Sequence, residues 1–319
     1  MNKLLCAFLG LLALLPVAHG QEKNFPDRAV KIMVPFTAGS GSDTSARFFG
    51  EQLAAIFGQP FVVENRPGAS GVLAVMAVKT APPDGHTILL ASNSPIAVNP
   101  IVIKDLPYDP IKDLRPISGL TRGMSGFIVA TNSSIKTIAD LVAASKAKPL
   151  NAGTYSAGYN LALEWFSSLA GAKVMNVPYK GGAQVFTDVM GNQLDFGIAD
   201  MGGVAPLLKA GKMRVLAVTG ETRHPDFPDV PTIKESGYPD YVFYTWTSFY
   251  VRSDTPDDIT SKLAAAMQKA LASPAARNFV ATAGGGELMP YPPDVMLKFQ
   301  LTEMERFRRI AASAGIVAQ

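Results

Sequence analysis

The sequence has very little cysteine and histidine: one cysteine, Cys6, and three histidines in 319 residues. Cys6 lies in a leader that we expect to be removed, which excludes disulfides, thiolate catalysis and cysteine-ligated zinc from the mature chain. Neither His86 nor His224 has a second histidine at metal-ligand spacing in the sequence, and there is no HExxH or GxSxG motif. We therefore predict no catalytic residue, no metal and no cofactor.

The chain also has little net charge, because its 29 basic residues are nearly balanced by 26 acidic ones. There is no Lys/Arg cluster and no alternation of basic with aromatic residues, so nucleic acid is not an expected partner. Asp105, Asp109 and Asp113 lie four residues apart in a proline-rich stretch. We interpret them as solvated loop charges rather than as metal ligands.

Long apolar runs are absent except at the N-terminus, where residues 4–17 form one of about 14 residues. This run is short for a membrane span of about 20 residues. Lys3 precedes it, and Ala18 and Gly20 supply small residues at the −3 and −1 positions of a cleavage site. We predict a signal peptide over residues 1–20, cleaved after Gly20, and export to the periplasm; an uncleaved anchor is the alternative.

Beyond residue 29, short β-branched runs alternate with helical stretches, which predicts an α/β fold with a mostly parallel sheet. A second series of such units starts near residue 126 and predicts two lobes. The predicted strands cover residues 30–34, 61–63, 87–90, 126–130, 150–154, 174–177, 194–199 and 215–219.

Helix signals mark both ends of the chain. The first helix should have Asp43 as its cap and should end at Gly58 and Pro60. Three helices should close the sequence, over residues 256–272, 274–283 and 292–312. The last of these is expected to bury one apolar face, formed by Leu297, Leu301, Met304, Phe307 and Ala311.

The loop between the first strand and the first helix is the strongest binding candidate. Its residues are Phe36, Thr37, Ala38, Gly39, Ser40, Gly41, Ser42 and Asp43. Glycines allow the backbone to approach a ligand, and a helix N-terminus presents unpaired N–H groups to an anion. The loop lacks the third glycine of a dinucleotide fingerprint and the Gly-Lys-Ser/Thr of a P-loop. A tight turn without a ligand is the alternative.

Three further segments follow predicted strands, where open α/β sheets bind ligands. They contain Ser92, Asn93 and Ser94; Tyr155, Ser156 and Asn160; and Asp200. The alternative for the first segment is a capped turn, and for the second a surface turn filled by a tyrosine. For Asp200 the alternative is a helix cap. Loops from both lobes would be able to close on one small molecule.

Motifs in a fixed order along nearly the whole mature chain resemble the periplasmic receptors of tripartite tricarboxylate transporters, the Bug family. They include Pro26-Asp27-Arg28, Val34-Pro35-Phe36, Glu64-Asn65-Arg66-Pro67-Gly68, Pro82-Pro83-Asp84-Gly85-His86, Leu106-Pro107-Tyr108-Asp109-Pro110, Val177-Pro178-Tyr179-Lys180-Gly181 and Pro228-Asp229-Val230-Pro231-Thr232. The segment between Gly158 and Glu164 is about four residues shorter than the family pattern. No relative's solute is therefore transferred to this chain.

The resemblance implies a two-lobed periplasmic binding protein of type II, a Venus flytrap with two crossover hinge strands. Lobe 1 would comprise residues 21–124 and 250–319, and lobe 2 residues 125–249. Such a receptor captures a small organic acid and delivers it to membrane permease subunits; we expect a monomer and no enzymatic activity. Backbone amides of residues 36–43 and 92–94 would hold a carboxylate, with Tyr155, Ser156, Asn160 and Asp200 opposite.

Two other functions compete with this one. A hydrolase or transferase on a similar scaffold would need a nucleophile with a base, or a metal, and the sequence offers neither. A periplasmic sensor that presents its closed form to a signalling partner is the third possibility.

Overall fold

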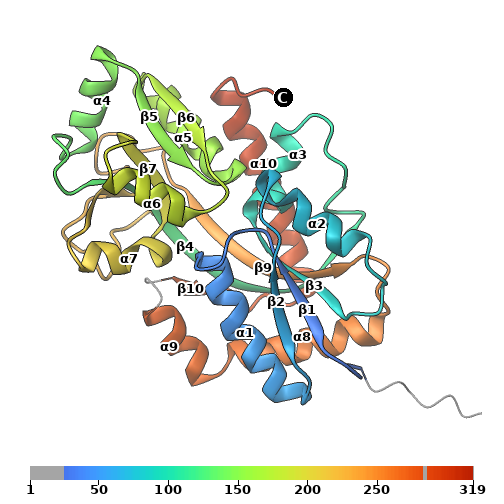
Figure 1. Ribbon diagram of the computed structural model, residues 1–319. Coiled ribbons are helices and arrows are strands. Elements are labelled where there is room, and N and C mark those ends of the chain that lie inside the picture. The colour runs from blue at the N-terminus through green and yellow to red at the C-terminus, as the bar shows by residue number, and fades with distance from the viewer. Residues whose placement is uncertain (1–24, 283–285, 319) are drawn as a thin grey trace, which may run out of the picture.

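The computed structural model describes residues 25–282 and 286–318, so the predicted signal peptide lies outside the described residues. Within these ranges, none of the helices combines the length and apolar character needed to span a membrane. Two α/β lobes are joined by two long strands that run through the middle of the molecule (Figure 1). The cavity described below lies between these lobes.

Lobe 1 is built around three parallel strands. Its elements are β1 (Val30–Val34), α1 (Gly41–Phe57), β2 (Phe61–Asn65), η1 (Ala69–Gly71), α2 (Val72–Lys79), β3 (Thr87–Ser92), η2 (Ser94–Val98), α3 (Asn99–Val102) and, after lobe 2, α8 (Asp257–Leu271), α9 (Pro274–Thr282), β10 (Glu287–Leu288) and α10 (Pro293–Ser313). β1 pairs in parallel with β2 and β3. Side chains alternate along β3: Ile88 and Leu90 face the core beside α1 and α8, whereas Leu89 and Ala91 face the other core.

Lobe 2 repeats the alternation of strand and helix. Its elements are α4 (Ile138–Ala147), β5 (Leu150–Thr154), α5 (Ala157–Ala170), β6 (Val174–Pro178), α6 (Gly182–Met190), β7 (Phe196–Asp200), α7 (Met201–Lys209) and β8 (Met213–Val218). β5 pairs in parallel with β6 and β7. Each βα connection therefore points its helix start toward one edge of the sheet.

The two long strands are β4 (Leu114–Ala130) and β9 (Tyr244–Arg252). β9 lies between β3 and β4 and is antiparallel to both. β4 pairs with β9 up to Met124, and from Ser125 onward it pairs with β7 and β8. The expectation of a mostly parallel sheet is thus correct inside each lobe and wrong at the junction. The residue limits given above for the lobes stay a prediction.

The expected apolar face of α10 is correct toward its C-terminal end, where Phe307 and Ala311 are buried, and is wrong by about one residue at its start. Leu297 and Leu301 are 37% and 48% exposed, whereas the neighbouring Gln300 and Glu303 are buried. Tyr250 donates its hydroxyl to Gln300 Oε1 at 3.0 Å, and Trp246 donates Nε1 to Glu303 Oε2 at 3.3 Å. Because β9 supplies these partners, polar residues occupy the buried stripe and an apolar pattern alone misplaces it.

Candidate functional site

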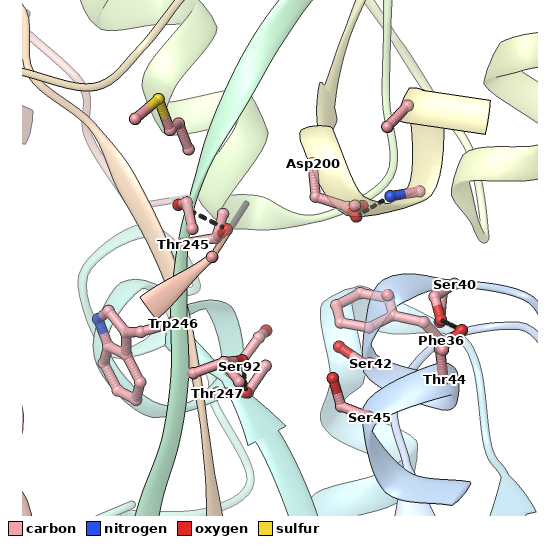
Figure 2. A pocket seen from close by; sticks show the side chains of 18 of the residues that line it. Phe36, Ser40, Ser42, Thr44, Ser45, Ser92, Asp200, Thr245, Trp246 and Thr247 are labelled. Atoms are coloured by element: carbon pink, nitrogen blue, oxygen red, sulfur yellow. Dashed lines mark hydrogen bonds between the residues drawn. The ribbon is translucent and has the colours of Figure 1, made fainter. Parts of the chain in front are cut away.

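A cavity of about 530 Å³ lies between the lobes. Figure 2 shows hydroxyl side chains from the start of α1 at the lower right, Asp200 above them, and Thr245 and Thr247 of β9 to the left. The cavity is therefore bordered by the first turn of α1, by β4 and β9, and by the starts of α5 and α7.

Ser40, not Asp43, is the N-cap of α1. Its Oγ accepts a hydrogen bond from the Asp43 amide at 3.2 Å, and its backbone is extended. Asp43 is the third residue of the helix and turns its carboxylate back to accept the Gly39 amide at 3.0 Å. The expected cap was wrong because two candidate caps lie three residues apart, and the carboxylate closes the loop instead.

The Asp43 carboxylate is neutralised away from the cavity. It is 4% exposed and accepts hydrogen bonds at 3.0 Å from Arg47 Nε and Nη2 and from Asn65 Nδ2. Burial raises the pKa of Asp43, but the bonds from Arg47, Gly39 and Asn65 outweigh it and hold the pKa below its usual value. Asp43 thus fixes the loop, and its charge is not offered to a ligand.

The first turn of α1 is left open toward the cavity. Gly41 and Ser42 are its first two residues, and both line the cavity, together with Ser45 one turn later. First-turn amides have no acceptor within their own helix. No charged side chain of α1 lines the cavity, so no acid of this helix occupies the positive end of its dipole. The nearest carboxylate is that of Asp200, which approaches Gly41 from lobe 2.

Gly39 is required by the backbone conformation and not by crowding. Its φ is +81°, in the left-handed region that favours glycine, and a Cβ placed there would meet nothing within 4 Å. The loop can therefore turn toward the cavity before α1 begins.

The two long strands supply a neutral, hydroxyl-bearing wall. Thr245 and Thr247 of β9 line the cavity, and Thr247 Oγ1 lies 2.8 Å from Oγ1 of Thr121 on β4. Trp246, between them, turns its ring away (Figure 2) and is 1% exposed beneath α10. This wall was not predicted from the sequence, although the alternation of Thr245, Trp246 and Thr247 was an available signal.

Asp200 faces the cavity from lobe 2 as the N-cap of α7. Its Oδ1 accepts the Gly203 amide at 2.6 Å, and its Oδ2 accepts the Tyr155 hydroxyl at 2.5 Å. Burial, reinforced by the Asp200 charge, raises the pKa of Tyr155 well above its usual value, so this hydroxyl stays protonated. Within the described ranges Asp200 has no cationic partner.

The cationic residues of the cavity lining are already paired. Arg122 lies 2.7 Å from Glu287, and Lys209 lies 2.9 Å from Asp226. Among residues 25–282 and 286–318, no three His, Cys, Asp or Glu side chains gather closely enough to hold a metal ion. The cavity thus presents mainly neutral donors.

Most predicted site residues share this cavity. Its lining includes Phe36, Gly39, Ser40, Gly41, Ser42, Ser92, Asn93, Tyr155, Ser156 and Asp200. Ala38 and Asp43 lie outside the lining. Ser94 instead accepts the Gly158 amide at 3.0 Å, and Asn160 donates Nδ2 to Glu164 at 2.9 Å beside a separate cavity. Contact of any of these residues with a ligand stays a prediction.

Comparison with known proteins identifies the family. Residues 45–316 match the model of the tripartite tricarboxylate transporter family receptor. A UPF0065 protein of Bordetella bronchiseptica is 34% identical over 96% of this chain and 91% of its own length. Protein BugT of Bordetella pertussis is 32% identical over 92% of this chain and 91% of its own.

A solved structure agrees. R. palustris Rpa4515 with adipate superposes with a TM-score of 0.89 and is 31% identical, covering 92% of this chain and all of that one. The two-lobed fold and the Bug resemblance are thereby confirmed. The chain belongs to the receptor family of tripartite tricarboxylate transporters, whose members are periplasmic solute-binding proteins and not enzymes.

Proposed function

We propose that the cavity between the lobes captures a small organic acid, with its carboxylate at the start of α1, for delivery to permease subunits of a tripartite tricarboxylate-type transporter. The observation that carries this proposal is the open first turn of α1 at Gly41 and Ser42, with its own acid, Asp43, already neutralised. Asn93 adds a buried donor: it is 1% exposed, lines the cavity, and its Nδ2 has no partner among the described residues.

Neutral donors are sufficient for useful affinity. Two or three charge-assisted hydrogen bonds contribute about 1.5–3 kcal/mol each, and a helix dipole about 0.3–2 kcal/mol. The sum, about 3–11 kcal/mol before ordering costs, brackets the roughly 8 kcal/mol of micromolar binding. An arginine clamp is thus unnecessary, although lobe closure must enclose the rest of the solute.

The size of the cavity and a relative's ligand support the same class of solute. A volume of about 530 Å³ falls in the range of about 300–1,000 Å³ typical of small-molecule sites. Adipate, a dicarboxylate, accompanies the solved structure of Rpa4515. Besides Asn93 and the α1 turn, the ligand-binding residues would be those that line the cavity, namely Phe36, Gly39, Ser40, Ser92, Tyr155, Ser156 and Asp200. Ala38, Ser94 and Asn160, which were also predicted from the sequence, lie outside this lining.

Export and assembly complete the proposal. Residues 1–20 would be removed, so intact-mass analysis of periplasmic protein should give an N-terminus at Gln21; retention of Met1 would contradict this.

The receptor would act as a monomer, which light scattering at working concentration tests. Co-purification with a permease rather than with a sensor kinase would favour transport over sensing.

A thermal-shift screen tests the binding proposal. Monocarboxylates, dicarboxylates, tricarboxylates and aromatic acids are compared, because a ligand at 100 times its Kd stabilises the fold by about 2.7 kcal/mol. The acid that binds should be recovered chemically unchanged in mass spectrometry; conversion to a product would favour the hydrolase or transferase alternative. Stabilisation by none of these acids would reject the proposed class of ligand.

A further inference from the structure

Three glycines lie where the lobes meet, and each is covered by a polar side chain of the other lobe. A Cβ on Gly41 would lie 2.7 Å from Asp200 Oδ1, and one on Gly158 would lie 2.8 Å from Ser94 Oγ. A Cβ on Gly181 would overlap the Thr37 hydroxyl. We call these three pairs, Gly41 with Asp200, Gly158 with Ser94 and Gly181 with Thr37, the glycine seats.

Backbone conformation does not explain these glycines. None of the three has a φ in the left-handed region, and the φ of Gly181, −173°, is ordinary extended backbone. Gly39 and Gly171 are the opposite case, since both have positive φ and open space where a Cβ would stand. At the seats, the space taken by the opposite lobe is therefore what requires glycine.

The Gly158 seat also joins the lobes by a hydrogen bond. Gly158 is the second residue of α5, and its amide donates to Ser94 Oγ at 3.0 Å. The next amide, that of Tyr159, is already held by Ser156 Oγ of the same lobe. Ser94 thus completes the cap of a lobe 2 helix from lobe 1, and separation of the lobes would leave that amide to water.

We propose that the glycine seats are the contacts formed when the lobes close, and that they set how far closure proceeds. The three seats involve three different lobe 2 elements, namely the starts of α5, α6 and α7. The Gly41 seat borders the cavity itself. Closure is thereby limited by direct approach of backbone to side chain, and a methyl group at a seat must either displace the opposing side chain or hold the lobes apart.

A matched pair of substitutions separates this role from ordinary packing. Gly158→Ala places a methyl group against the other lobe, whereas Gly153→Ala places one 2.6 Å from Leu194 of its own lobe. Gly158→Ala should increase the radius of gyration and leave the unfolding midpoint unchanged or higher, since alanine favours helix. Gly153→Ala should lower the midpoint by roughly 2 °C or more without expansion. Expansion in neither variant, or a fall in midpoint for both, would overturn the proposal.

Removing the Ser94 hydroxyl should reverse the expansion caused by Gly158→Ala. Ser94 Oγ is the atom nearest to the new methyl group, at 2.8 Å, and Asn93 Nδ2 follows at 3.3 Å. Gly158→Ala combined with Ser94→Ala removes the closer contact and should regain the compact radius of the parent. Failure of the double variant to contract would show that the expansion arises elsewhere.

An engineered cross-link tests a second seat. In a Cys6→Ser background, Thr37→Cys with Gly181→Cys places the two Cβ atoms about 3.0 Å apart, slightly below the usual disulfide spacing of about 3.8 Å. Mild oxidation should form the disulfide, and the oxidised protein should be more compact than Gly158→Ala. Absence of the cross-link, or equal radii, would overturn the proposal. No ligand is required, so the result is independent of the proposed carboxylate binding.

Discussion

α1 of lobe 1 and α7 of lobe 2 both begin at the cavity, and they treat the positive end of the helix dipole differently. The first turn of α1 is capped by a neutral hydroxyl, Ser40, and its acid, Asp43, faces away toward Arg47. The start of α7 is filled by its own carboxylate, Asp200. A helix N-terminus can bind an external anion only where the chain does not already supply one.

The two carboxylates differ correspondingly in what holds them. Asp43 is bound by a cation, a side-chain amide and a backbone amide. Among the residues that the structure describes, Asp200 is bound only by a tyrosine hydroxyl and a backbone amide. We therefore assign Asp43 to the stability of the lobe 1 loop, and we expect Asp200 to act on whatever enters the cavity.

Asp43→Ala should have the largest effect on stability. It removes the acceptor of Gly39, Arg47 and Asn65 at once, and we expect a loss of about 2–3 kcal/mol in the free energy of unfolding. Urea unfolding measures this. Arg47→Ala is the control: its side chain is 53% exposed, so the loss should stay below about 1 kcal/mol. Equal losses would show that the ion pair alone holds the loop.

Acid should reproduce part of this loss in the unmodified protein. The pKa of Asp43 is lower in the folded state than its usual 3.8. Its contribution is therefore fully present above pH 3.8 and is lost as the pH falls through the folded value. Unfolding measured against pH should show a steeper acid slope for the parent than for Asp43→Asn.

Gly39→Ala should come next. The φ of +81° costs a residue with a Cβ about 1–2 kcal/mol, and no clash adds to it. The loss should appear in unfolding and extend to ligand affinity, because the loop positions the open turn of α1. A larger loss in Gly39→Val confined to binding would point to crowding of the ligand instead.

Ser40→Ala should cost about 1 kcal/mol of stability through the lost cap, within the usual range of about 0.5–2 kcal/mol. Ser42→Ala, in the same turn but without a capping bond, is the matched control and should be nearly neutral in unfolding. If the two variants unfold alike, the hydroxyl of Ser40 does not cap the helix.

Asp200→Asn should have the smallest effect on the free energy of unfolding. Unlike the other variants, it should strengthen ligand binding. Asparagine still caps a helix well, while removal of a like charge near a bound carboxylate should tighten binding about three- to tenfold. Calorimetric titration with the acid found in the thermal-shift screen measures this. Weaker binding would mean that Asp200 itself receives a donor from the ligand.

The sequence predicted local elements well and long-range ones poorly. The bounds of β1 and β5 were predicted to the residue. β1 is a short run rich in β-branched and apolar residues, and β5 is delimited by Pro149 before it and by the loop with Ser156 after it. β9 was not predicted, and only the last five residues of β4 were. Proline and glycine interrupt the first part of β4, and its strand conformation depends on pairing with residues far along the chain.

The candidate site shows the same limit. Loops at strand ends were found because a parallel sheet gathers them at one edge. The threonine wall was missed with β9, and Ser94 proved to contact α5 across the lobes. Which of Ser40 and Asp43 caps α1 depends on side-chain direction, which residue type alone does not determine.

The insertion of β9 between β3 and β4 has a consequence for how the chain folds. The sheet of lobe 1 lacks the strand that joins β3 to β4 until β9, which follows the other strands of lobe 2 in the sequence, is available, whereas β5, β6 and β7 are neighbours in sequence. Closing the long loop between β3 and β9 is slow relative to local pairing. During refolding, amide protons of β5 and β7 should therefore become protected from exchange before those of β3, so that the inserted lobe organises the one that surrounds it.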